Sequence, residues 1–184
     1  MITLIIGGSG SGKSAYAEEE FFRLCNKGRK YYLATMKVYD KDGEKRVERH
    51  RQMRKDRGFC TIEQSENIEH AMEKMEGKDN AVLLECMSNL VANEMYQEKI
   101  YTAREVTDKI KNGIEQLEKN LTHLMIVTNN VFEDGGLYDE MTMEYLHALD
   151  EINIWLAAKA EKVTEVVVGI PVFCKGQEVN SETY

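Results

Sequence analysis

The chain has 184 residues, of which 42% are hydrophobic, and a formal net charge of −8 at pH 7. This length suits one domain, residues 1–184, with a substantial core, and it leaves no room for a second large domain. The acidic balance excludes a general nucleic-acid-binding surface, which would be basic overall, so any site for an anion must be locally basic.

Apolar runs alternate along the sequence with segments of helical pattern. In chain order we expect a strand over residues 2–6, a helix over 14–27 that Gly28 stops, strands over 30–35 and 60–64, a helix over 67–75, a strand over 81–86, helices over 88–97 and 102–119, a strand over 124–129, a helix from about 138 to 162 and a last strand over 165–172. The single proline, Pro171, indicates either an edge strand or the end of that last strand.

Continuous apolar strands separated by helices indicate a mostly parallel sheet that helices cover on both faces. The predicted fold class is therefore α/β, with a three-layer architecture. Ligands in such sheets bind at the carboxyl ends of the strands. We expect Gly7–Ser14, Thr35, Glu85 and Asn129 to face one crevice at this edge.

The segment that follows the first strand carries the strongest chemical signal. It matches the phosphate-loop pattern G-x-x-x-x-G-K-[ST] with Gly7, Gly8, Ser9, Gly10, Ser11, Gly12, Lys13 and Ser14. Its glycines let successive backbone N–H groups turn inward around phosphate oxygens, and the helix that begins near Lys13 adds its positive end. The sequence therefore predicts that all eight residues bind a nucleoside triphosphate. With this loop, the predicted α/β fold is the RecA-like one of P-loop NTPases.

Three side chains would handle charge at this loop. Lys13 is expected to reach the β- and γ-phosphates, and Ser14 to offer its hydroxyl to Mg²⁺, which prefers hard oxygen ligands. Glu85 ends an apolar strand, where P-loop proteins place an acidic group that holds Mg²⁺ directly or through water. The alternative for Glu85 is a carboxylate that only meets solvent or caps the next helix.

A basic block stands out in the acidic chain. Residues 44–57 contain seven Lys or Arg residues against three acidic ones. On a helix, Arg46, His50 and Arg54 would share one face, with an imidazole between two guanidinium groups. Neighbouring cations favour neutral His50, which can attack phosphorus, while the arginines suit phosphate contacts. The alternative is a solvated helix face with a spectator histidine.

Several short pieces, taken together and in order, resemble one family. They are Gly7–Ser14, Tyr32–Thr35, Arg46–Arg51 with Arg54, Thr61–Glu63, Leu83–Cys86 with Asn93, Val127–Asn129, and Asn153 with Leu156-Ala157 and Val166–Gly169. The ordered set resembles the bifunctional adenosylcobinamide kinase / adenosylcobinamide-phosphate guanylyltransferase family of cobalamin assembly, and it extends over nearly the whole chain.

This resemblance implies a transferase with two reactions. The aminopropanol hydroxyl of adenosylcobinamide would be phosphorylated with ATP or GTP in the presence of Mg²⁺, and GMP from GTP would then be transferred to that phosphate through a guanylylated histidine. The position that matches this histidine is His50, which would act as an activated nucleophile. Arg46, Arg51 and Arg54 would stabilise the departing pyrophosphate. The resemblance also implies a homotrimer with sites shared between subunits.

The second half departs from the family pattern. Asn130 stands where the family usually has an acidic residue, Phe59 stands about where a tryptophan is usual, and residues 146–154 are altered. The changes fall on the part expected to contact the corrinoid substrate or a partner subunit. Two alternatives therefore stay open, a P-loop kinase for another small alcohol or nucleotide, and a non-catalytic nucleotide-binding protein.

The cysteines and the apolar segments indicate the cellular compartment in which the protein is expected. Cys25, Cys60, Cys86 and Cys174 are widely spaced, form no CxxC pair and have no histidine at metal-ligand spacing, so reduced thiols are expected. The amino terminus enters a strand without a basic stretch, and no apolar run approaches the length of a membrane span. We therefore expect a soluble, cytoplasmic protein.

Overall fold

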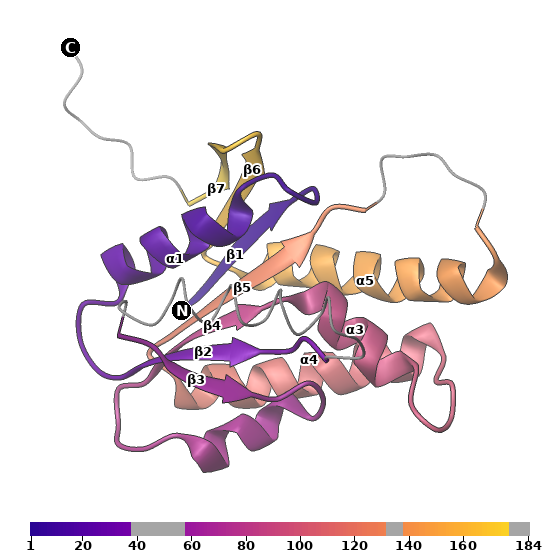
Figure 1. The fold of residues 1–184 in the computed structure, drawn as a ribbon, viewed down its shortest axis with the longest axis horizontal. Helices are drawn as coiled ribbons and strands as arrows, with labels where there is room; N and C mark the ends of the chain where they lie inside the picture. The colour runs from indigo at the N-terminus through magenta and orange to yellow at the C-terminus, as the bar shows by residue number, and fades with distance from the viewer. Residues whose placement is uncertain (38–57, 132–137, 177–184) are drawn as a thin grey trace.

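The strands form one seven-stranded sheet in the order β3-β2-β4-β5-β1-β6-β7 (Figure 1). The structure is a computed structural model that describes residues 1–37, 58–131 and 138–176. The strands are β1 (Ile2–Gly7), β2 (Lys30–Ala34), β3 (Cys60–Glu63), β4 (Ala81–Glu85), β5 (His123–Asn129), β6 (Lys162–Val167) and β7 (Ile170–Lys175). Among these seven strands, every pairing is parallel except that of β6 with β7. The prediction of a mostly parallel α/β sheet is confirmed.

Helices cover both faces of this sheet. They are α1 (Lys13–Leu24), the 3-10 helix η1 (Ile68–Lys74), α3 (Met87–Met95), α4 (Ala103–Asn120) and α5 (Glu140–Lys159). Helix α1 lies on one face, and the others lie on the opposite face (Figure 1). Within the described part of the chain, no helix combines the length and apolar content that crossing a bilayer requires.

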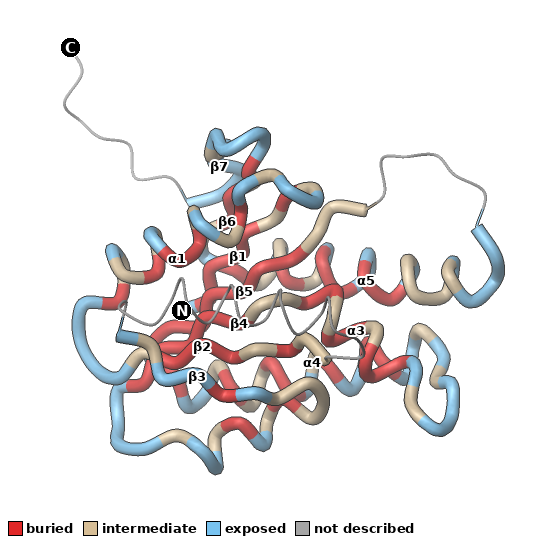
Figure 2. Tube along the Cα trace, in the orientation of Figure 1, coloured by how far each residue is buried: buried red, intermediate tan, exposed pale blue. Residues whose placement is uncertain are grey.

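The core divides into two layers because successive strand residues point to opposite faces. In β4, Leu83 packs with Phe21 of α1, while the neighbouring Leu84 packs with the helices of the other face. The central strands are buried along nearly their whole length, as the red segments of Figure 2 show. These buried strands support the carboxyl edge of the sheet, where the predicted site lies.

The end of the chain corrects one prediction. The single strand expected over residues 165–172 is wrong, because β6 and β7 form an antiparallel hairpin. Val168 and Gly169 make its turn with φ values of 50° and 81°, as in the two-residue turns that suit right-handed strand twist. The sequence does not predict this turn, because Val168 is β-branched and such residues disfavour positive φ. Pro171 lies in β7 at the sheet edge, so the edge-strand prediction is confirmed.

Two helix ends also differ from the prediction. Helix α1 ends at Leu24, not residue 27, and the N–H of Cys25 closes it on the Phe21 carbonyl at 2.8 Å. Gly28 lies in the following turn, where a Cβ atom would come within 1.8 Å of the Asp79 carbonyl oxygen. Helix α5 ends at Lys159, because β6 already begins at Lys162.

Candidate functional site

The glycine-rich loop joins β1 to α1 at the carboxyl edge of the sheet. Gly7 ends β1, and a Cβ atom there would lie 2.6 Å from both Ser11 Oγ and the Val166 carbonyl oxygen. Gly12 has a φ of 88° and precedes the first helical residue. These two positions explain why the loop needs glycine, since one has no room for a side chain and the other has a left-handed backbone.

Helix α1 offers its amino terminus to this loop. Its N-cap residue is Gly12, and among the described residues no side chain caps the first turn. Backbone N–H groups in a first helical turn have no partner within the helix, and the helix dipole adds positive charge there. The arrangement suits a phosphate group at the end of α1.

Lys13 adds a full positive charge at the same point. Its side chain lies largely inside the protein, at 8% exposure, and its Nζ donates a 3.0 Å hydrogen bond to the Gly8 carbonyl oxygen. Burial lowers the pKa of Lys13, and the negative charges that Cys86 and Glu85 can carry partly oppose this shift. A phosphate bound in the loop would stabilise the buried ammonium group.

The Glu85 carboxylate lies beside the start of α1. Ser14 Oγ donates a hydrogen bond to Glu85 Oε1, and the Tyr32 hydroxyl donates one of 2.9 Å to Oε2. The Ser14 contact joins the two residues that the sequence predicted as magnesium ligands. Two hard oxygen donors at one point match the ligand preference of Mg²⁺.

Thr35 and Asn129 lie at the ends of the neighbouring strands. The Thr35 side chain is fully buried, and its hydroxyl accepts from the Cys86 N–H and donates to the Cys86 carbonyl, both at 2.8 Å. Asn129 Nδ2 donates to Ser88 Oγ at 2.7 Å. Thr35 thus holds the backbone that follows Glu85, and its direct contact with nucleotide stays a prediction.

The structure adds supporting residues that sequence reasoning did not assign a role. Tyr32 contacts Glu85, although its place in an apolar strand gave no sign of this. From α5, Asn153 Oδ1 accepts from the Thr128 hydroxyl at 2.7 Å, and Asn153 Nδ2 donates to the Asn129 carbonyl at 3.3 Å. A buried asparagine in a helix was the available signal, because such a side chain needs polar partners.

The basic block lies outside the described residues. Arg46, His50, Arg51 and Arg54 all fall within the gap between residues 37 and 58. Their nucleotide-binding and catalytic roles therefore stay predictions from the sequence.

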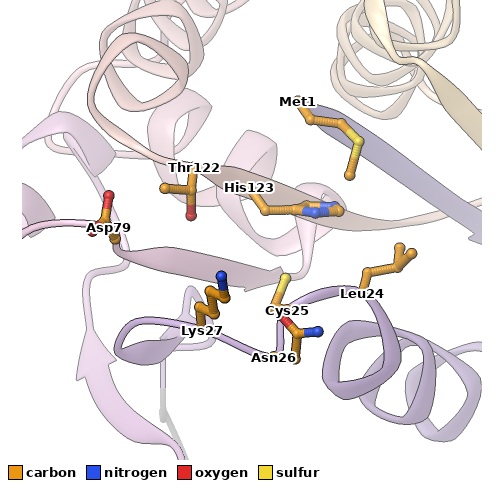
Figure 3. A pocket seen from close by; sticks show the side chains of 8 residues that line it. All are labelled: Met1, Leu24, Cys25, Asn26, Lys27, Asp79, Thr122 and His123. Carbon is orange, nitrogen blue, oxygen red and sulfur yellow. The ribbon is translucent and has the colours of Figure 1, made fainter.

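A pocket of about 490 Å³ opens at the end of the sheet where the parallel strands begin, opposite the glycine-rich loop (Figure 3). Its lining residues are Met1, Leu24, Cys25, Asn26, Lys27, Asp79, Thr122 and His123. His123 begins β5, and Met1 precedes β1, so the pocket lies at the amino ends of the strands. This position separates it from the glycine-rich loop.

Comparison with known proteins shows one family over most of the chain. A model of the family described as "Cobinamide kinase / cobinamide phosphate guanyltransferase" matches residues 3–174. The bifunctional adenosylcobalamin biosynthesis protein CobU of Escherichia coli (strain K12) is 28% identical over 185 residues, which covers 95% of this chain and all of that protein. The protein of the same name from Salmonella typhimurium is 26% identical, with the same coverage.

One solved structure shares the fold. The flagellar accessory protein FlaH from Methanocaldococcus jannaschii superposes with a TM-score of 0.51 at 12% identity, covering 95% of this chain and 77% of that one. At this identity the likeness concerns the fold alone, which is that of P-loop NTPases.

Proposed function

Because the chain belongs to the cobinamide kinase / cobinamide phosphate guanyltransferase family, we propose that it catalyses both reactions on a corrinoid substrate. A nucleoside triphosphate first phosphorylates the aminopropanol hydroxyl of adenosylcobinamide, and GMP from GTP is then transferred to the new phosphate. The observation that carries the proposal is the contact of Ser14 with Glu85 beside the glycine-rich loop, next to the buried Lys13.

In the kinase reaction the loop and Lys13 position the triphosphate. Backbone N–H groups of the loop and of the first turn of α1 bind phosphate oxygens, and the Lys13 ammonium group moves from the Gly8 carbonyl to the β- and γ-phosphates. Phosphoryl transfer depends mainly on such positioning and charge stabilisation. The hydroxyl oxygen of the acceptor forms the new bond to the γ-phosphorus, and the nucleoside diphosphate leaves.

Ser14 and Glu85 are the residues that would hold Mg²⁺. Across residues 1–37, 58–131 and 138–176, no three His, Cys, Asp or Glu side chains come together as a metal site. Two protein oxygens would therefore need phosphate oxygens to complete the coordination. The bound ion would spread the negative charge of the triphosphate.

In the second reaction we assign the nucleophile to His50. Its imidazole nitrogen forms a bond to the α-phosphorus of GTP, pyrophosphate leaves, and Arg46, Arg51 and Arg54 stabilise its charge. An oxygen of the corrinoid phosphate then attacks the same phosphorus and releases His50. Support for these roles comes from the sequence pattern and the family.

Labelling with GTP that carries radioactive phosphorus at the α position tests whether Lys13 serves the kinase reaction and His50 the transfer of GMP. With Mg²⁺ and no corrinoid, the wild-type chain should gain one GMP, and peptide mass spectrometry should locate it on His50. The His50→Ala variant should lose this label and keep phosphorylation of the corrinoid. Lys13→Ala should lose corrinoid phosphorylation. Unchanged labelling of His50→Ala would remove His50 from the mechanism.

A kinase for another small alcohol is the second candidate, because Asn130 stands where the family usually has an acidic residue. Nucleotide turnover that does not depend on a corrinoid, without covalent GMP, would favour it. The family resemblance also leads us to propose a homotrimer, which sedimentation equilibrium of the free protein can test.

A further inference from the structure

The turn between β6 and β7 touches the glycine-rich loop directly. The N–H of Gly169 donates a 2.7 Å hydrogen bond to the Ser11 carbonyl oxygen. A Cβ atom on Gly12 would lie only 3.4 Å from Gly169 Cα. Figure 1 shows this hairpin, in yellow, beside the indigo loop that leads into α1.

This hydrogen bond orients a peptide group of the loop. The peptide between Ser11 and Gly12 is trans, so its C=O and N–H point in opposite directions. With the Ser11 carbonyl held by Gly169, the Gly12 N–H must point away from the hairpin. In this motif the backbone N–H groups of the loop cradle phosphates, and Gly12 N–H is one of them.

The hairpin also meets the beginning of the loop. A Cβ atom on Gly7 would lie 2.6 Å from the Val166 carbonyl oxygen, at the carboxyl end of β6. Strands β1 and β6 pair in parallel, with Ile6 beside Glu165. Both ends of the loop therefore abut the hairpin, which is itself tied to the central sheet.

The backbone conformation of the turn, and not side-chain packing, directs the Gly169 N–H toward the Ser11 carbonyl oxygen. Val168 is 87% exposed, and a Cβ atom on Gly169 would have no neighbour within 4 Å among the described residues. The φ of 81° at Gly169 is disfavoured for residues other than glycine, and asparagine tolerates it best among the rest. A substitution here changes the turn without a clash.

We propose that Gly169 is a positioning residue of the phosphate-binding loop, which fixes the Ser11–Gly12 peptide so that Gly12 N–H faces the bound phosphates. The inference rests on the proposed nucleotide function. It assigns the β6–β7 turn, outside the recognised phosphate-loop motif, a part in binding the triphosphate.

Affinity measurements on hairpin variants test this inference. The probes are Mg²⁺-GTP and Mg²⁺-tripolyphosphate, with dissociation constants from calorimetry. Gly169→Val forces a β-branched residue into a left-handed turn and should weaken both probes by about tenfold. Gly169→Asn should rescue most of this loss. Val172→Thr, an exposed change on β7, should bind as the wild type does.

Equal affinity of Gly169→Val and wild type for both probes would overturn the inference, even if the variant unfolds at a lower temperature. Loss of GTP binding with tripolyphosphate binding unchanged would also overturn it. A wild-type chain that binds neither probe would overturn the nucleotide function and this inference together.

Amide exchange of the wild-type chain gives a second measurement, which does not depend on the folding of any variant. The Gly169 N–H should exchange with solvent several-fold more slowly once Mg²⁺-tripolyphosphate is bound, because the loop that accepts its hydrogen bond is then held in place. An unchanged exchange rate at saturating probe would contradict the coupling of turn and loop.

Discussion

The Tyr32 hydroxyl donates a 2.9 Å hydrogen bond to Oε2 of Glu85, between two adjacent parallel strands. Ser14 donates to the other carboxylate oxygen. Tyr32 is 3% exposed, and its ring packs at 5.7 Å, centroid to centroid, from that of Phe59. A rigid aromatic side chain thus holds the carboxylate in place from the α1 side of the sheet.

Tyr32→Phe should therefore weaken the binding of Mg²⁺-nucleotide while the protein keeps its fold. The loss of one hydrogen bond to a charged group is expected to cost about 1 to 2 kcal/mol, or roughly a five- to thirtyfold weaker affinity in calorimetry. Tyr31→Phe is the matched control, because its hydroxyl contacts the backbone of Glu76 instead. An equal loss of affinity in both variants, or one that persists in EDTA, would contradict this role of Tyr32.

Glu85→Gln should change the magnesium dependence of phosphoryl transfer. The amide keeps the shape of the side chain but removes the negative charge that would attract Mg²⁺. We expect the rate to fall by at least about a hundredfold and the half-saturating magnesium concentration to rise. Affinity for nucleotide in EDTA should hold or increase, because a like charge is removed. Glu76→Gln, on the surface beside Arg29, serves as the control. If the half-saturating magnesium concentration of Glu85→Gln equals that of the wild type, Glu85 is not a magnesium ligand.

The glycine-rich loop and the strand ends were predictable because their signals are local. The loop motif encodes its own backbone geometry, and apolar runs such as residues 81–84 locate buried strands without knowledge of their neighbours. Parallel order then places Ser14 and Glu85 at one edge. The structure adds that the two side chains are hydrogen-bonded to each other there.

The hairpin and the Tyr32 contact were not predictable in the same way. Val168 adopts a positive φ against its own preference, so the pairing of β6 with β7 overrides the local signal. Tyr32 meets Glu85 only because β2 and β4 are neighbours in a particular register. Both strands are buried on both faces, so their apolar runs do not alternate and specify neither the strand order nor the register.

Asn93 should contribute to stability through two hydrogen bonds of its buried side chain. It is 6% exposed, and its Nδ2 donates to the carbonyls of Thr35 at 2.7 Å and Ser65 at 3.1 Å. Asn93→Leu would remove both hydrogen bonds from the interior and should lower the free energy of unfolding by about 2 to 3 kcal/mol in urea titrations. Asn120→Leu removes an exposed bond to the Gln116 carbonyl and should cost under about 1 kcal/mol. Comparable losses in the two variants would refute the burial argument.

The last prediction concerns His123, which should make the fold sensitive to mild acid. The side chain is 4% exposed, and its Nε2 lies 3.0 Å from Thr3 Oγ1. Burial above all, and then the nearby amino-terminal ammonium group, lower the pKa of His123 from 6.5 to about 4. Between these two pH values the unfolded chain binds a proton that the folded chain does not. The stabilising contribution is therefore complete above about pH 6.5 and is lost as the pH falls towards 4.

The size of this effect follows from the difference in pKa, which corresponds to a loss on the order of 3 kcal/mol by pH 4. Urea titrations of wild type and His123→Gln between pH 4 and 7.5 measure it as the difference between their pH profiles. Every other group that responds to acid is common to the two proteins, so its contribution largely cancels in that difference. His70→Gln, a change on the exposed surface, should leave the wild-type profile intact. If His123→Gln and wild type lose stability in parallel below pH 6.5, His123 is not the group that responds to acid.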